Sequence, residues 1–231
     1  MTEAVIVSTA RTPIGKAYRG GFNNLAGATL GAASVSAAVE RAGIDPSRVD
    51  DVIMGSALQQ GATGSNIARQ VALRAGLPDT VSGMSLDRQC SSGLMAVATA
   101  AKQITEDGMS VVVGGGLESI SLVQNEHMNL HRMVDEELLA IEPNIFMPML
   151  QTAEVVAERY NVSREKMDEY GLQSQERTAA AYAAGKFADE LTPVTCKAKP
   201  PDMTDTPVAL ITGASRGLGA ALAEALCETH H

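Results

Sequence analysis

The chain of 231 residues has no tryptophan, few aromatic residues and no long apolar run. Aromatic residues make up only 3% of it, so alanine, glycine and methionine must supply much of the core. No apolar stretch reaches the roughly 18 residues that cross a bilayer. Glu3 precedes a short apolar run at residues 4–7, which is not the pattern of a secretory signal peptide. We therefore expect a cytoplasmic protein with no membrane span.

Positive charge is also scarce in this sequence. Twenty-seven acidic residues stand against 18 lysines and arginines, which gives a formal net charge of -9. A surface of this sign repels the phosphates of nucleic acids and of anionic lipids. Nucleic-acid and membrane partners are therefore not expected.

Cysteines are few and widely separated. Cys90, Cys196 and Cys227 form no CxxC pair and no cluster with histidine at the spacing of a zinc site. His127 and His131 are four residues apart, but no third ligand accompanies them, so we interpret them as surface or loop histidines. The sequence predicts reduced thiols, no disulfide framework and no metal.

Strand-like and helix-like segments alternate over the first half of the chain. Apolar runs predict strands at residues 4–8, 52–54, 81–86 and 111–113, and helical spacing predicts helices at 29–42, 66–75 and 91–106. Such alternation favours parallel strand pairing and an α/β sandwich with helices on both faces.

The pattern loosens after Gly116, where two further helices are expected near residues 152–160 and 164–184. Three prolines among polar residues then indicate a linker. We expect an α/β domain with a partial loop domain at residues 1–197, a linker at 198–206 and a separate fragment at 207–231.

The final fragment begins with an apolar run at residues 208–212 and continues into a glycine-rich turn. A turn of this kind lets backbone amides bind a pyrophosphate at a helix N-terminus. Residues 212–219 resemble the Thr-Gly-x-x-x-Gly-x-Gly turn of short-chain dehydrogenase/reductases, which implies an NAD(P)-dependent reductase fragment as an alternative function. A βαβ unit needs about 30 residues or more, and that family's Ser and Tyr-x-x-x-Lys catalytic set is absent. We expect a lone βα fragment, and no cofactor-binding residue is assigned.

Cys90 lies between the apolar run that ends at Leu86 and the helix expected from Ser91. The unpaired N–H groups and the dipole of a helix start stabilise a thiolate, and the same amides can hold an oxyanion during acyl transfer. Ser91, Ser92 and Gly93 leave little bulk around the sulfur. From the residues alone, Cys90 is either a nucleophile or a small apolar residue packed at a helix start.

Several motifs decide between these interpretations. The sequence reads RQCSSGL at residues 88–94, and it carries RTPIG at 11–15, GSNIARQ at 64–70, GGLES at 115–119, TAEVVA at 152–157 and SRE at 163–165. Their order resembles the thiolase family from about residue 2 to residue 197. Asp87 stands where that family frequently has asparagine.

The resemblance implies an acyltransferase that cleaves a 3-ketoacyl-CoA with coenzyme A or condenses two acyl-CoA molecules. It implies that Cys90 attacks the carbonyl and carries the acyl group as a thioester. Coenzyme A thioesters are then substrates, with no separate cofactor. It also implies a thiolase-like α/β/α sandwich half with a mixed, largely parallel sheet, and assembly as a homo-oligomer.

Parts of the thiolase pattern are missing from this sequence. The family's Gly-His-Pro histidine, its second catalytic cysteine and its Asn-Glu-Ala-Phe motif lie in the second half of its chain, and none of them occurs here. Cys196 and Cys227 stand in unrelated contexts. We therefore expect an incomplete chain with little activity alone. The other alternative is a non-catalytic half that needs a complementing partner.

Overall fold

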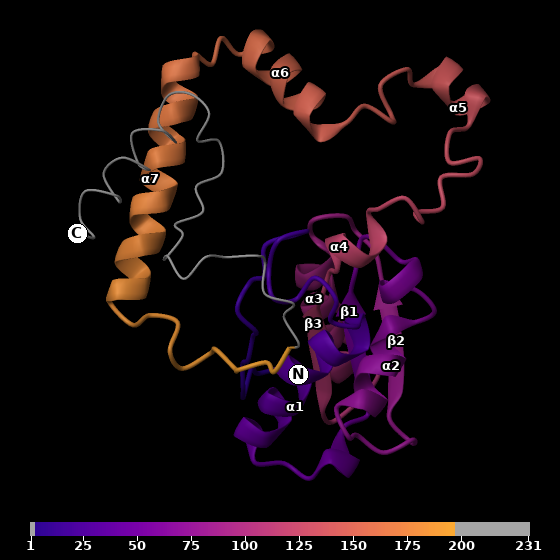
Figure 1. The fold of residues 1–231 in the computed structure, drawn as a ribbon. Helices are drawn as coiled ribbons and strands as arrows, with labels where there is room; N and C mark the ends of the chain where they lie inside the picture. The colour runs from indigo at the N-terminus through magenta and orange to yellow at the C-terminus, as the bar shows by residue number, and fades with distance from the viewer. Residues whose placement is uncertain (1–2, 197–231) are drawn as a thin grey trace. The chain divides into compact units, whose positions relative to one another are not determined.

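The computed structural model describes residues 3–196 (Figure 1). The described chain divides into two compact units, one made of residues 3–129 and 188–196 and the other of residues 130–187. The expected linker at 198–206 and fragment at 207–231 lie outside the described residues, and the proposed domain limits stay predictions. No helix within residues 3–196 combines the length and the apolar character needed to cross a bilayer.

The first unit is built on a three-stranded parallel sheet. Its strands are β1 (Asp51–Gly55), β2 (Ser82–Leu86) and β3 (Val112–Gly116), in the order β2-β1-β3. In the central strand, Asp51 pairs with Ser82 on one side and with Val112 on the other. The predicted α/β class and parallel pairing are confirmed. All pairs in the described sheet are parallel, so a mixed sheet stays a prediction.

Helices cover both faces of this sheet, as predicted. The helices α1 (Gly27–Ala42) and α2 (Ile67–Arg74) pack on one face, and α3 (Ser92–Thr105) packs on the other (Figure 1). Successive side chains of a strand point to opposite faces. Val52 and Met54 accordingly belong to the core beside α1 and α2, whereas Ile53 packs against α3. The short helix α4 (Ile120–Val123) follows β3.

The ends of two helices follow local chemistry. Gly43 adopts a left-handed conformation, with φ of 65°, and ends α1 as expected. Asn66 also has a positive φ, and its side chain accepts a hydrogen bond from the Arg69 amide at the start of α2. A Cβ at Gly31 would lie 2.6 Å from a Val71 methyl group, so glycine permits the close approach of α1 and α2.

The strand predicted at residues 4–8 is wrong. These residues form no strand, and the side chains of Val5, Ile6 and Val7 are 71%, 76% and 73% exposed. Their apolar character favours burial, but a strand also needs a neighbour whose backbone groups it can pair with. Farther along, Arg41 of α1 donates a hydrogen bond to the Thr9 carbonyl, and the Arg11 backbone bonds to Glu190 and Thr192.

The second unit is helical. It contains α5 (Glu136–Ile141), α6 (Met149–Arg159) and α7 (Arg164–Ala183), so the helices expected near 152–160 and 164–184 are confirmed. Ser163 caps α7, and Arg164 forms an ion pair with Asp168 at 3.0 Å. None of the residues of these three helices is buried in the described structure.

Candidate active site

Cys90 lies in the turn that connects β2 to α3, at the carboxyl edge of the parallel sheet. Its side chain is a free thiol, and the residue is exposed. Two residues later, α3 begins at Ser92. The sequence-based placement of Cys90 at a helix start is therefore confirmed, and the alternative of a buried structural cysteine is wrong.

Side chains on both sides of Cys90 fix the turn. An Asp87 carboxylate oxygen accepts a hydrogen bond from the Gln89 amide at 2.6 Å. The Ser92 hydroxyl accepts from the Arg88 amide at 2.9 Å and donates to the Gln89 carbonyl at 2.6 Å. Ser92 is only 4% exposed, and Gln89 has a φ of 49°. The turn is thus held by exposed and partly buried hydrogen bonds, and Cys90 beside them is exposed.

The carboxyl ends of the other two strands reach the start of α3. A Cβ at Gly55, the last residue of β1, would lie 2.2 Å from the backbone carbon of Ser92. A Cβ at Gly116, the last residue of β3, would lie 3.2 Å from the Cα of Gly93. Strand and helix can approach this closely only because these positions are glycine. The first residues of α3, Ser92 and Gly93, therefore pack directly against two strand ends.

Glu118 connects two of the loops at this edge. Its carboxylate accepts hydrogen bonds from the Ala57 amide at 2.8 Å and from the Ser56 hydroxyl at 3.1 Å. These contacts join the loop after β3 to the loop after β1. Sequence reasoning quoted Glu118 within the GGLES motif but gave it no role, since its partners lie about 60 residues away in the sequence.

Asn66 makes a similar connection between α2 and β2. Its amide donates to the Gly83 carbonyl at 2.8 Å, and its carbonyl oxygen accepts from the Ser85 hydroxyl at 3.1 Å. A Cβ at Gly83 would lie 2.6 Å from the Cα of Arg69, so the helix also packs directly on the strand. The strand that leads to Cys90 is thereby attached to α2.

The other cysteines and histidines that the sequence singled out lie away from Cys90 or belong to no metal-binding group. Cys196 is half-buried, and its sulfur would lie 3.3 Å from a Cβ at Gly21. His127 is highly exposed and lies 3.7 Å from the carboxylate of Glu126. Within residues 3–196, no three histidine, cysteine or acidic side chains are placed to hold a metal ion. Cys227 lies outside the described residues.

The chain thus has a parallel α/β sheet with an exposed cysteine in the turn between a strand and a helix. The model of the thiolase N-terminal domain matches residues 4–209. The chain therefore belongs to the thiolase family.

Individual relatives agree with this assignment. The chain is 41% identical over 195 residues to a 3-ketoacyl-CoA thiolase of Bacillus subtilis, a match that covers 84% of this chain and 49% of the relative. It is 42% identical over 208 residues to an acetyl-CoA acetyltransferase of Paracoccus denitrificans, a match that covers 86% of this chain and 53% of the relative. The crystal structure of the Bacillus anthracis acetyl-CoA acetyltransferase matches this structure with a TM-score of 0.75 at 34% identity. The match covers 87% of this chain and 53% of the crystallised one. The chain spans about half the length of the relatives it matches.

Proposed function

We propose that the chain supplies the nucleophile half of a thiolase-type acyltransferase acting on coenzyme A thioesters, with Cys90 as the acyl carrier. The observation that carries the proposal is the exposed Cys90 thiol in a hydrogen-bonded turn directly before α3. The N-terminus of α3 favours negative charge on the sulfur. Membership of the thiolase family and the printed activities of the relatives support the same chemistry.

In the cleavage direction, the Cys90 thiolate attacks the 3-keto carbonyl carbon of a 3-ketoacyl-CoA. The bond between the 2- and 3-carbons breaks, and its electron pair leaves with the acetyl-CoA fragment, which takes up a proton. The acyl group remains on the sulfur as a thioester. The thiol of a second coenzyme A then attacks this thioester, which releases a shortened acyl-CoA and restores Cys90. Condensation of two acyl-CoA molecules is the reverse sequence.

By itself, this chain should have little acyltransferase activity. A nucleophile needs a base within hydrogen-bond reach, and the resemblance places the family's activating histidine in the half of the relatives that the match leaves out. We therefore propose that Cys90 accepts an acyl group slowly and that turnover requires a complementing half. The mixed sheet and the homo-oligomer implied by the family belong to this proposal. The residues that suggested the reductase alternative lie outside the described structure.

The test is acylation of the chain by acetyl-CoA and acetoacetyl-CoA, followed by peptide mass spectrometry. Cys196 is half-buried in the same chain, so it serves as an internal control. We expect the acyl group on Cys90 to exceed that on Cys196 by about tenfold or more, because reactivity follows thiolate character and access. The variant Cys90→Ser should lose this label while retaining its fold. Equal labelling of Cys90 and Cys196 would contradict the proposed nucleophile.

A further inference from the structure

Glu118 lies two residues after the end of β3, and its carboxylate holds the loop that follows β1. One carboxylate oxygen accepts from the Ala57 amide at 2.8 Å, and the other accepts from the Ser56 hydroxyl at 3.1 Å. Ser56 is only 1% exposed. Glu118 therefore fixes both the backbone of this loop and one of its buried side chains.

The same loop is bonded to the strand that leads to Cys90. The Ser56 amide donates to the Leu86 carbonyl at 3.0 Å, and Leu86 is the last residue of β2, four residues before Cys90. Ser56 thus bonds to Glu118 through its hydroxyl and to Leu86 through its amide. Hydrogen bonds consequently connect the carboxyl ends of all three strands of the described sheet.

This loop also reaches the start of α3 through Gly55, the residue before Ser56. A Cβ at Gly55 would lie 2.2 Å from the backbone carbon of Ser92, and the Gly55 carbonyl accepts from the Leu117 amide at 3.1 Å. Close-packed interiors transmit displacements. A shift of the loop after β1 would therefore act on Leu86 before Cys90 and on Ser92 after it.

We propose that Glu118 is a positioning residue for Cys90. Its carboxylate holds the loop after β1, and that loop fixes both ends of the turn that presents the thiol at the start of α3. This inference rests on the proposed function, because the task it assigns to Glu118 belongs to acyl transfer at Cys90. Glu118 acts through Ser56 and Leu86, and it needs no contact with the substrate.

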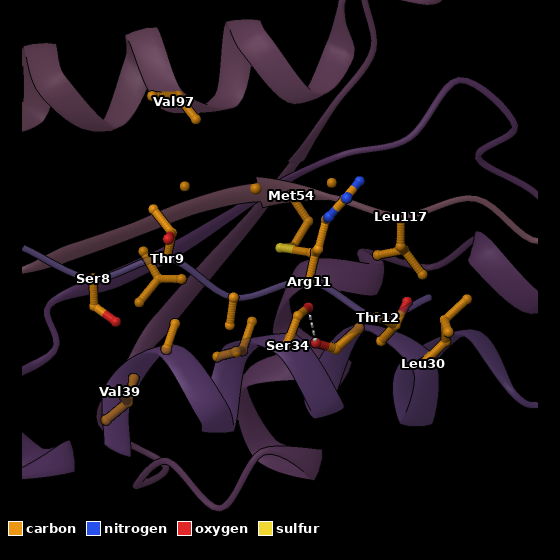
Figure 2. A pocket seen from close by; sticks show the side chains of 18 of the residues that line it. Ser8, Thr9, Arg11, Thr12, Leu30, Ser34, Val39, Met54, Val97 and Leu117 are labelled. Carbon is orange, nitrogen blue, oxygen red and sulfur yellow. Dashed lines mark hydrogen bonds between the residues drawn. The ribbon is translucent and has the colours of Figure 1, made fainter. Parts of the chain in front are cut away.

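Glu118 also lines a cavity of about 840 Å³ in the first unit. Figure 2 shows its neighbour Leu117 in the wall of this cavity, together with Val97 of α3 and Leu30 of α1. Water enters a cavity that has room for it and polar partners in its wall. In Glu118→Ala, water should therefore solvate the donors of the loop after β1. The variant should fold, but the bonded connection between the loops would be lost.

Three variants separate positioning from general stability. Glu118→Ala removes both acceptors. In Glu118→Gln, the amide oxygen can accept from the Ala57 amide, while the amide nitrogen donates to the Ser56 hydroxyl, which is able to accept as well as donate.

Asp50→Ala is the matched control. The Asp50 carboxylate accepts from the Ser110 and Val111 amides at 2.7 and 3.1 Å, so it connects the segments before β1 and β3 at the opposite edge of the same sheet.

The first measurement is the rate at which acetyl-CoA acylates Cys90 in the full chain. We expect Glu118→Ala to slow it about tenfold or more and Glu118→Gln to stay within about threefold of the original, because a displacement of about 1 Å at a reacting group can cost about 100-fold. Asp50→Ala should keep the original rate even if its free energy of unfolding falls.

The second measurement is alkylation of Cys90 by iodoacetamide relative to Cys196, which reports on the thiol without acyl transfer. We expect a decrease of about threefold or more in Glu118→Ala and recovery in Glu118→Gln, because the helix start favours the reactive thiolate. If the original chain is not acylated at Cys90, the proposed function fails, and the alkylation rates still decide whether Glu118 positions the thiol.

Three outcomes would overturn the positioning role. The first is a folded Glu118→Ala that modifies Cys90 as fast as the original chain with both reagents. The second is an equal loss of rate in Glu118→Ala and Asp50→Ala, which would assign the effect to stability. The third is a loss in Glu118→Gln as large as that in Glu118→Ala. Should Glu118→Ala fail to fold, Glu118→Asp gives the same comparison, because its shorter side chain should miss one of the two donors.

Discussion

Each side chain around Cys90 performs a separable task. Cys90 presents the sulfur, Asp87 and Ser92 hold the turn, and Glu118 connects the loops after β1 and β3. Of these four residues, only Ser92 is buried. Its hydroxyl binds backbone groups on both sides of Cys90 from a position that is only 4% exposed. Ser92 therefore acts on the backbone of the turn that carries Cys90.

Replacing Ser92 by alanine should destabilise the chain and loosen the turn. The Arg88 amide would lose the Ser92 hydroxyl, while the Gln89 carbonyl would keep its hydrogen bond from the Ser92 amide. An unmet polar group in a buried setting costs about 1–3 kcal/mol. The free energy of unfolding in urea should fall by that amount. The alkylation rate of Cys90 should change at pH values where the chain remains folded. Ser91→Ala is the matched control, because Ser91 is exposed, and it should change stability by less than about 0.5 kcal/mol. Equal effects of the two substitutions would exclude the assigned role of Ser92.

Asp45 provides a prediction for acid pH. Its carboxylate caps the short 3-10 helix Pro46–Arg48, and the hydrogen bond from the Ser47 amide, helped by the Ser47 hydroxyl, lowers its pKa below the ordinary value. Because the pKa is lower in the folded chain than in the unfolded one, this cap stabilises the fold above the unfolded pKa of about 3.9. The contribution is lost as the pH falls through the folded pKa. In a carbon-13 NMR titration, Asp45 should still be mostly ionised at the pH where aspartates without such hydrogen bonds are half protonated. An ordinary titration midpoint for Asp45 would contradict this.

At the scale of elements, the helices and strands that depend on local apolar periodicity could be predicted from the sequence. The strands β1, β2 and β3 and the helices α1, α2 and α3 could be recognised because each carries its apolar pattern within its own residues. The segment at 4–8 was predicted wrongly because a strand depends on its neighbour as well as on its composition. The contacts of Glu118 with Ser56 and Ala57 were not predicted, since pairings across such separations leave no pattern in one sequence.

The packing of β1 against α3 gives a test of how closely these elements approach. In Gly55→Ala, the new Cβ would lie 2.2 Å from the Ser92 backbone, so either the strand or the helix start must move. Overpacking of this kind costs about 1–3 kcal/mol, which chemical unfolding would measure. Gly93→Ala is the matched control in α3. A Cβ there meets no atom within 4 Å, and alanine favours helix by about 0.5–1 kcal/mol. If Gly55→Ala leaves the free energy of unfolding unchanged, β1 and α3 are not tightly packed at this position.

At the scale of the whole molecule, the described chain presents surfaces that suit a further domain. Leu94 of α3, four residues after Cys90, is 75% exposed. The helices α5, α6 and α7 contain no buried residue in the described structure. Amphipathic helices gain most of their stability from packing against a partner surface. These exposed surfaces are the ones that the proposed complementing half would cover.

Complementation tests this view. The chain should be mixed with the separately expressed C-terminal half of the Bacillus subtilis 3-ketoacyl-CoA thiolase, whose own N-terminal half this chain matches at 41% identity. We expect a complex by size-exclusion chromatography and a thiolysis rate at least about tenfold above that of either half, because a positioned base contributes about 10²–10⁴-fold. The variant Cys90→Ser should form the complex but show no increase in the thiolysis rate. Leu94→Asp should weaken the complex while leaving direct acylation of Cys90 by acetyl-CoA unchanged. A complex that forms with no gain in rate would leave assembly intact and exclude Cys90 as the nucleophile of the joined halves.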